Sequence, residues 1–314
     1  MCTSIAMRKS GFYFGRNLDL EYDFDQRVVI TPRNYPFHFR CEAPMKEHPA
    51  IIGMAAVADG YPLYAEAANE HGLCIAGLNF PNNAHYFPET SECKRSVSPF
   101  ELIPWILCHC RTATEAKTLL GQTRLVGISF SDSLPLTPLH WHIADKECSI
   151  VVEPTALGLK IYDNPTDVLT NNPTFPFHLS NLCRYLHLTP APPRNYLQTI
   201  EGITPFSAGM GAIGLPGDCS SPSRFVRAAY LLHHSYSAEG EAEQICQFFH
   251  LLSAVEMVRG SVVLDGGQLE FTRYSSCYSA PEKVYYYTTY EIRAPKAVSL
   301  AGQETGSKLL EYPL

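Results

Sequence analysis

The chain has 314 residues, of which 46% are hydrophobic and 18% are charged, and its formal net charge is −7. This composition allows a large hydrophobic core and excludes a disordered chain. The negative charge, and the lack of any Lys/Arg run longer than two residues, argue against a nucleic-acid partner. No apolar run approaches the ~20 residues of a membrane-spanning helix, so we expect no membrane segment.

Eleven cysteines are scattered along the chain without regular spacing, which fits neither a disulfide framework nor a zinc module. Short clusters of Cys and His at 108–110, 140–142 and 233–234 match no metal-binding spacing. We therefore expect reduced thiols and no metal. The first residues lack the apolar stretch of a secretory signal, so the cytoplasm is the expected compartment.

The predicted elements begin with a hairpin, in which strands 2–7 and 12–16 flank a turn at 9–11. Strands follow at 27–31, 50–57, 63–67 and 73–79, and then helices at 99–110 and 113–120. Strands return at 125–130, 139–144, 149–153, 159–162 and 168–170. Helices are predicted at 177–185, at 222–234 with Ser221 as N-cap, and at 239–254, before two last strands at 269–278 and 283–290.

This order of elements predicts an α+β fold in which the two terminal parts of the chain share a sheet. Two stacked sheets between layers of helices would fit it. We expect one domain over residues 1–314, since no repeat or linker interrupts the chain. The proline-rich stretch 188–193 is too short for a flexible linker, and we interpret it as an ordered excursion that contacts another subunit.

The most informative residue for function is the cysteine at position 2. Initiator methionine is routinely removed before a small second residue, and removal here would leave Cys2 with both a thiol and a free α-amine. Such an amine titrates near ~7.7–8, so it can accept the thiol proton and later pass it to a leaving amine. Taken alone, a cysteine at this position is usually an accident of composition.

Two charged residues at the end of the hairpin are expected to lie close to this cysteine. Arg16 and Asp19 follow the returning strand, which brings them to the same end of the sheet as Cys2. An arginine near the thiol favours the thiolate, and an aspartate near the ammonium holds and orients the amine. Without Cys2, the two residues would be interpreted as a surface ion pair at the end of a hairpin.

Met-Cys-Thr at the start of the chain, followed by Phe-Gly-Arg-Asn-Leu-Asp at 14–19, resembles the choloylglycine hydrolase family of N-terminal-nucleophile hydrolases. Bile salt hydrolases and penicillin V acylases belong to that family. Other segments match in the family's order over essentially the whole chain. They are Thr31-Pro32-Arg33-Asn34-Tyr35, Asn69-Glu70-His71-Gly72-Leu73, Gly77-Leu78-Asn79-Phe80-Pro81, Leu139-His140-Trp141, Leu169-Thr170-Asn171-Asn172-Pro173, Leu215-Pro216-Gly217-Asp218 and Ser223-Arg224-Phe225.

The resemblance implies an αββα sandwich, a homotetramer and hydrolysis of conjugated bile salts without metal or organic cofactor. It assigns the attack on the amide carbonyl to Cys2. Asn171 looks like the family's oxyanion donor and Asn79 like a second one. Arg224 matches the family's distal arginine, which would complete a charge network around the thiolate. Without the resemblance, Asn171 could equally be a turn residue and Arg224 a solvated helix charge.

The family's acyl pocket is apolar and is built from loops after the early strands. The residues in equivalent regions are Leu18, Tyr22, Phe24, Tyr61, Tyr64, Phe130, Leu134 and Leu136, each of which could instead be ordinary core. The nearest alternative is a penicillin V acylase, for which we expect an aromatic residue in place of Asn79. An acylase of fatty-acyl amides or acyl homoserine lactones, and a catalytically dead bile-acid binder with Met1 retained, are further alternatives.

Overall fold

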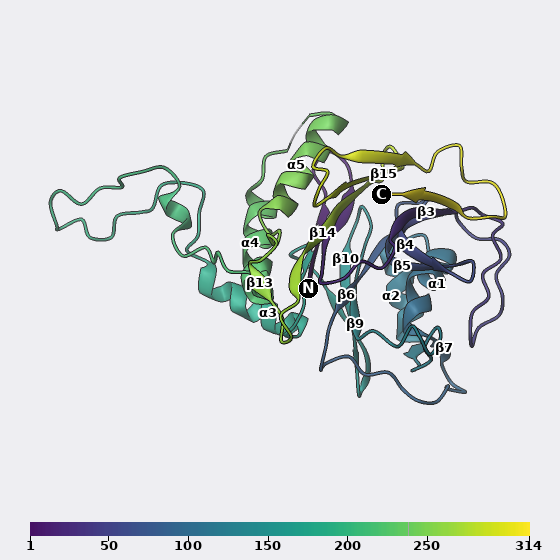
Figure 1. Cartoon of the computed structure of the whole chain (residues 1–314). Coiled ribbons are helices and arrows are strands. Elements are labelled where there is room, and N and C mark those ends of the chain that lie inside the picture. Colours follow the sequence, from purple (N-terminus) through teal and green to yellow (C-terminus); the bar gives the residue numbers. More distant parts are fainter. Residues whose placement is uncertain (238) are drawn as a thin grey trace.

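Two antiparallel sheets lie face to face between layers of helices in the computed structural model, which describes residues 1–237 and 239–314 (Figure 1). The first sheet has the strand order β12-β1-β2-β14-β15-β16, and β13 pairs with β14 outside that path. The bounds of these strands are β1 Cys2–Met7, β2 Tyr13–Leu20, β12 Val168–Leu169, β13 Val262–Val263, β14 Leu269–Ser279, β15 Val284–Thr289 and β16 Lys296–Ser299. Both terminal parts of the chain therefore contribute to this sheet, as predicted.

The second sheet has the order β11-β10-β9-β6-β5-β4-β3-β17. Its strands are β3 Arg27–Thr31, β4 Ile51–Ala58, β5 Tyr61–Asn69, β6 Cys74–Asn79, β9 Leu139–Ala144, β10 Ser149–Thr155, β11 Gly158–Asp163 and β17 Leu310–Pro313. A separate parallel pair joins β7 Arg95–Val97 to β8 Thr123–Leu125. The α+β prediction of two stacked sheets between helix layers is confirmed.

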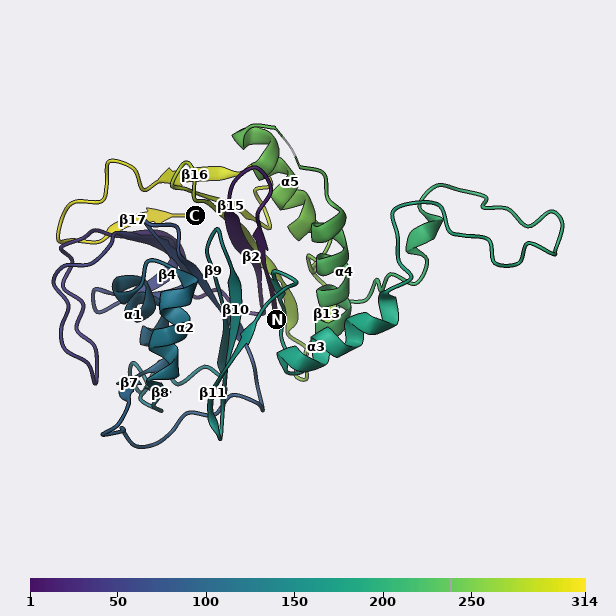
Figure 2. The same cartoon turned by 180° about the vertical axis from the view of Figure 1, so that it is seen from behind.

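Helices cover the outer faces of both sheets, which the reverse view shows clearly (Figure 2). The second sheet is covered by α1 Leu102–His109, preceded by the 3₁₀ turn η1 Pro99–Glu101, and by α2 Ala113–Gly121. The first sheet is covered by α4 Ser221–His234 and α5 Glu241–Ser253, with α3 Phe175–Leu182 and η2 Cys183–Tyr185 beside α4. None of the described helices has the length and apolarity needed to cross a membrane.

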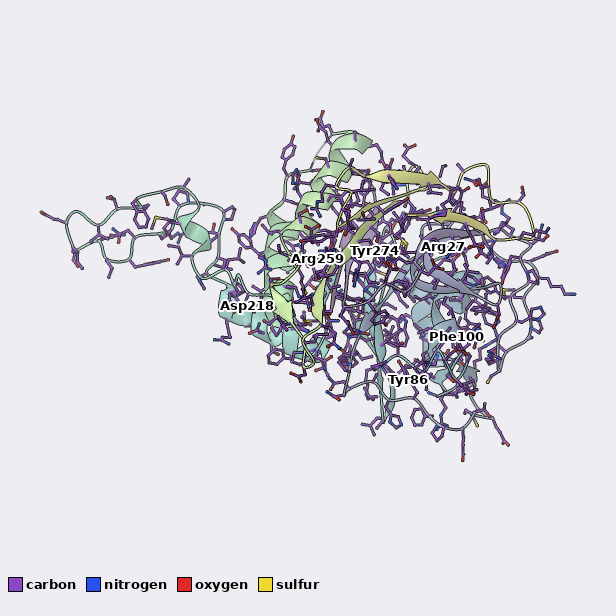
Figure 3. All side chains as sticks on the ribbon, viewed as in Figure 1. Arg27, Tyr86, Phe100, Asp218, Arg259 and Tyr274 are labelled. Atoms are coloured by element: carbon purple, nitrogen blue, oxygen red, sulfur yellow. The ribbon has the colours of Figure 1, made fainter. Side chains whose placement is uncertain are left out.

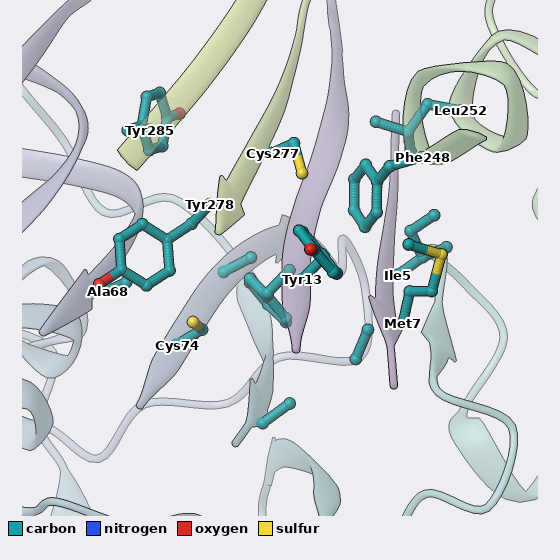
Figure 4. Packing of buried hydrophobic residues seen from close by; sticks show 14 of the residues in the cluster. Ile5, Met7, Tyr13, Ala68, Cys74, Phe248, Leu252, Cys277, Tyr278 and Tyr285 are labelled. Carbon is teal, nitrogen blue, oxygen red and sulfur yellow. The ribbon is translucent and has the colours of Figure 1, made fainter. Parts of the chain in front are cut away.

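Apolar side chains fill two core regions. One lies between the sheets and beneath α4 and α5, and the other lies beneath α1 and α2. Figure 4 shows part of the first region, where Ile5 and Met7 of β1 lie near Phe248 and Leu252 of α5. Because side chains alternate along a strand, β1 contributes one row of residues to this helix side and the other row to the space between the sheets.

A two-limbed arm, residues 186–220, projects away from the sheets between η2 and α4 (Figures 1 and 2). Its limbs touch at the short turn η3 Met210–Ala212, where Thr189 N–H donates to Gly211 O (3.0 Å). A Cβ at Gly211 would lie 2.0 Å from Ala191 O, so glycine allows this close approach. The proline-rich stretch 188–193 lies in this arm, and Figure 3 shows side chains standing out along it.

Most predicted elements form within a few residues of their expected bounds, but the short strands β7, β13, β16 and β17 were not predicted. Two further predictions were wrong in detail. The strand expected at 125–130 does not form: only Leu125 belongs to β8, Val126 makes an isolated bridge to Phe87, and Phe130 lines a cavity described below. Ser221 is the first residue of α4 rather than its N-cap, which is Ser220. The hydroxyl of Ser221 is used elsewhere, since it accepts from Asn171 N–H (2.8 Å) and donates to Thr170 Oγ1 (2.9 Å).

Candidate active site

Cys2 is the first residue of β1 and is 3% exposed, opposite Leu18 of β2. The neighbouring residues show which way its side chain faces. Thr3 lies on the helix side, where it accepts a hydrogen bond from Arg224 Nη1 (2.6 Å), whereas Ser4 contacts His142 Nδ1 of β9 in the second sheet (2.7 Å). Cys2 alternates with Thr3, so its thiol lies on the face that is turned toward the second sheet.

Asn171 and Arg224 hold the backbone of Cys2 from behind. The Cys2 N–H donates to Asn171 Oδ1 (2.7 Å), and Arg224 Nη1 donates to Cys2 O (2.5 Å). Arg224 Nη2 also donates to Asn171 Oδ1 (2.8 Å), while Asn171 Nδ2 donates to the backbone oxygen of Asn79 (2.8 Å). The structure thus brings together four of the predicted site residues, from β1, α4, the end of β6 and the loop after β12.

Asp19 lies beside the start of the chain and is fully buried. Its N–H donates to Met1 O (3.0 Å), and Thr272 Oγ1 donates to Asp19 Oδ1 (2.6 Å). Burial raises the pKa of Asp19, against the opposing charges of Arg224 and the Met1 ammonium. The Met1 ammonium donates to Asp19 O (2.8 Å) and forms an ion pair with Glu270, and burial lowers its pKa.

Arg16 crosses the space between the two sheets and is 1% exposed. Its Nη1 donates to two carbonyl oxygens of the second sheet, Gly77 O (2.5 Å) and Ala65 O (3.3 Å). The same nitrogen lies 3.7 Å from Glu66 Oε2. Burial by itself would lower the pKa of Arg16, but negative charge at Cys2 and at nearby acidic groups holds it above its ordinary value.

The loop that carries Asn171 is held by residues that the sequence analysis did not assign to the site. His140 Nε2 contacts Thr170 O (2.9 Å), and His178 Nε2 contacts Asn171 O (2.9 Å). Burial lowers the pKa of His178 to about 4, so its ring is neutral at pH 7. His140 lies in a segment that resembles the family, but no role at the site was predicted for it. Among residues 1–237 and 239–314, no group of three or more His, Cys, Asp or Glu side chains is arranged to hold a metal ion.

A largely apolar cavity of about 400 Å³ opens beside Cys2. Five of the eight predicted pocket residues line it, namely Leu18, Tyr22, Phe24, Tyr64 and Leu134, and so do Arg16 and Asn79. Lining residues that the sequence did not reveal include Leu20, Ala56, Val57, Ala58, Leu63, Thr137 and Leu139.

An adjoining cavity of about 420 Å³ shares Tyr22, Tyr64 and Leu134 with the first, and Phe130 and Leu136 line it. Tyr61 lines neither cavity. It is partly buried and packs edge-on against Phe37 and Phe100 at the core beneath α1, and its ring also contacts Phe130. Burial raises the pKa of its hydroxyl. The two cavities together give Cys2 an extended apolar neighbourhood.

Comparison with known proteins places this geometry among related chains. The family model described as linear amide C–N hydrolases, choloylglycine hydrolase family, matches residues 2–308. A bile salt hydrolase/transferase of Lactiplantibacillus plantarum is 46% identical, over 100% of this chain and 97% of that protein. A bile salt hydrolase/transferase of Clostridium perfringens is 36% identical, over 96% of this chain and 92% of that protein.

Solved structures agree with these relatives. A mutant conjugated bile acid hydrolase from Clostridium perfringens superposes with a TM-score of 0.92 at 34% identity, covering 100% of this chain and 97% of that one. A penicillin V acylase from Agrobacterium tumefaciens gives a TM-score of 0.76 at 18% identity, covering 99% and 90% of the two chains. The second likeness bears on the fold alone.

Proposed function

Since the chain belongs to the choloylglycine hydrolase family of linear amide C–N hydrolases, we propose that it cleaves the amide bond of glycine- or taurine-conjugated bile salts. The single observation that supports this best is the apolar cavity whose wall contains Cys2 and Arg16. A steroid acyl group presents mainly apolar surface, so its binding depends on such a lining. The proposal treats residues 1–314 as one domain.

The proposed reaction begins with the removal of Met1, which leaves the α-amine on Cys2. This amine accepts the thiol proton, and the thiolate sulfur attacks the amide carbonyl carbon. The C–N bond then breaks, the leaving amine takes the proton from the α-ammonium, and the acyl group stays on Cys2 as a thioester. Water attacks the thioester, with the α-amine as base, and the free bile acid leaves.

The other predicted residues have roles that fit their positions. Asn171 and Asn79 are the proposed donors to the oxyanion, and one such donor contributes roughly 3–4 kcal/mol to the transition state. The nitrogen of Cys2 already donates to Asn171 Oδ1. Asp19 is close to this nitrogen, because its own N–H donates to Met1 O, in the peptide group before Cys2. Asp19 is therefore the proposed partner of the new ammonium, while Arg16 and Arg224 supply positive charge on either side of Cys2.

We also propose that the protein forms a homotetramer through the arm and that it works in the cytoplasm. Large apolar side chains stand exposed along the arm: Leu186, Tyr196, Leu197, Ile200, Ile203, Phe206 and Ile213. A concentration of such residues on a projecting segment is typical of a protein–protein contact. All eleven cysteines lie in the described residues as free thiols, which fits a reducing compartment.

The function is tested by incubating the processed protein with glycocholate, taurocholate and penicillin V and measuring the released amine or acid. We expect release of glycine and taurine well above release from penicillin V. The Cys2→Ala variant is the control, and it should fold normally while losing hydrolysis by several orders of magnitude. Processed protein that hydrolyses penicillin V but neither bile salt would contradict the proposal.

A further inference from the structure

A buried carboxylate, Glu66 of β5, collects hydrogen bonds from the opposite sheet. Its Oε1 accepts from Ser276 Oγ (3.0 Å) and Tyr285 OH (2.6 Å), and its Oε2 accepts from Tyr274 OH (2.7 Å). The side chain is only 2% exposed. Tyr274 and Tyr285 are buried residues of the first core region, and they are labelled in Figures 3 and 4, respectively. Burial raises the pKa of Glu66, and the charge of Arg16 and these three hydroxyl donors act against that shift by favouring the ionised carboxylate.

Glu66 is also the nearby counter-charge of Arg16. Its Oε2 lies 3.7 Å from Arg16 Nη1, and both side chains are almost fully buried. A buried guanidinium without an opposite charge is strongly unfavourable. The hydrogen bonds to Gly77 O and Ala65 O fix the place of the guanidinium, but carbonyl groups do not cancel its charge. Glu66 does so.

Arg16 therefore has acidic neighbours besides Glu66, and one of them is Cys2. The charged or titratable groups that act on it are Cys2 of β1, Tyr274 of β14, Glu66 of β5 and Asp19 of β2. Cys2 and Arg16 share a cavity wall, whereas Glu66 lies among the tyrosines between the sheets and does not line that cavity. The charge of Glu66 offsets part of the field that Arg16 exerts on the sulfur of Cys2.

We propose that Glu66 is a positioning residue for the reaction, which acts through Arg16 to limit how strongly the site stabilises the Cys2 thiolate. This inference rests on the proposed role of Cys2 as nucleophile. A thiolate that is stabilised too strongly is a weaker nucleophile, because nucleophilicity falls with basicity. With Arg16, Arg224 and the α-ammonium all positive near Cys2, a second carboxylate besides Asp19 keeps the thiolate reactive.

The test is Glu66→Gln, which keeps the size and one acceptor oxygen but removes the charge. The readout is the rate at which iodoacetamide alkylates Cys2 between pH 4 and pH 9, followed by mass analysis of the N-terminal peptide so that the other cysteines do not interfere. We expect the pH of half-maximal rate to fall by about one unit. We also expect kcat for glycocholate to fall about three- to tenfold, with KM changed less than about twofold.

Two further variants separate this role from simple packing. Glu101→Gln is the matched control, because Glu101 is also buried and accepts backbone N–H bonds from Arg40 and Ser98, yet it is not among the groups that act on Arg16. It should leave the alkylation profile unchanged. Tyr285→Phe removes one donor to Glu66 and so favours its neutral form. It should shift the profile in the same direction by a smaller amount.

A profile that stays in place in both Glu66→Gln and Tyr285→Phe, or that moves to higher pH, overturns the inference. Tyr285→Phe keeps the test valid if Glu66→Gln does not fold. The alkylation readout needs no substrate. A wild-type protein that hydrolyses no bile salt would therefore defeat the proposed function while still allowing the effect of Glu66 on Cys2 to be measured.

Discussion

The chemically important difference between the unprocessed chain and the proposed enzyme is the state of the nitrogen of Cys2. With Met1 in place, the nitrogen of Cys2 is a peptide N–H that donates to Asn171 Oδ1, and a peptide nitrogen cannot serve as a base. The free amine of this form is that of Met1, which is held by Glu270 and Asp19. The residue that supplies the nucleophile is already in place, but the base is not.

We therefore predict that a chain with a blocked N-terminus is inactive. An N-terminal fusion that retains a residue before Cys2 should reduce taurocholate turnover by at least ~10²-fold, since general-base catalysis contributes that much. Proteolytic exposure of Cys2 should restore turnover, and intact mass shows which form is present. A fusion after Leu314 is the control and should be harmless. Full turnover by the blocked chain would refute the role of the α-amine.

A second residue prediction concerns Asn79, whose backbone oxygen accepts from Asn171 Nδ2 and which lines the cavity with Cys2. Asn79→Ala should lower kcat for glycocholate about 10²-fold and change KM much less, because an oxyanion donor acts mainly in the transition state. Leu134→Ala, in the same cavity wall but without a donor, should mainly raise KM. Asn79→Tyr should lose bile salt turnover while keeping penicillin V hydrolysis.

Wild-type rates of bile salt hydrolysis in both Asn79 variants would show that Asn79 only packs. Asn79 would then give no reason to favour bile salts over penicillin V as substrates. The cysteine mechanism would not be affected, since it depends on Cys2, Arg16, Asp19 and Asn171.

At the scale of elements, helix α4 carries Arg224 to Cys2, and Asp218 stabilises the start of that helix. Asp218 Oδ1 accepts from Ser220 N–H (2.9 Å) and its Oδ2 accepts from Ser223 Oγ (2.6 Å). These hydrogen bonds lower the pKa of Asp218 to about 2. Figure 3 shows Asp218 at the base of the helix, where the arm returns to the body.

Asp218→Asn should lower the free energy of unfolding by ~0.5 kcal/mol at pH 7, a small effect because the carboxylate is exposed to solvent. The folded pKa lies below the unfolded value of 3.8, so this stabilisation is present above about pH 4 and disappears as the pH falls through about 2. Urea unfolding at pH 7 and pH 3 measures the difference. Asp163→Asn, which breaks a surface pair with Lys117, is the control and should change little at pH 7. An undiminished difference at low pH would contradict the assignment.

The sequence predicted those elements whose pattern of apolar and polar residues indicates which side chains are buried or where a helix begins. Alternating or continuous apolar runs marked the central strands, and the Ser-Pro start marked α4. The strands β16 and β17 were missed because both are short, lie at sheet edges and include polar residues or proline, so neither shows an apolar row. Pairing with distant strands, rather than local preference, makes them strands.

The prediction of the site was limited in the same way, because contacts between distant parts of the chain leave no local signal in the sequence. Cys2 could be singled out because a cysteine that becomes the first residue can supply both nucleophile and base, and because Arg16, Asp19 and the family resemblance support that role. Glu66 and Ser221 gave no signal, since one glutamate in a strand and one serine at a helix start are ordinary. Their roles arise only when the sheets stack and α4 meets the loop of Asn171. Tyr61 shows the reverse case, an aromatic residue that was predicted to line the pocket but packs against the core beneath α1.

For the whole molecule, the arm is notable because its large apolar side chains are exposed in the isolated subunit. Phe206 of the arm is 87% exposed, and other apolar residues of the arm are also exposed. We predict that Phe206→Asp lowers the oligomeric state measured by analytical ultracentrifugation, because a charge in an apolar contact is strongly unfavourable. Tyr236→Asp, at an exposed aromatic residue outside the arm, should leave the assembly unchanged. A wild-type monomer at micromolar concentration would contradict the proposal.

The strand order of the first sheet also has a consequence for biosynthesis. Thr272, which bonds to Asp19 and belongs to the strand beside β2, lies 253 residues later in the chain. A ribosome adds ~5–20 residues per second, so the start of the chain waits roughly 13–50 s for this neighbour. Throughout that interval β14 cannot enclose the first residue, and an aminopeptidase can reach it. The late arrival of β14 thus gives the cell a time window for exposing the nucleophile before the fold closes over it.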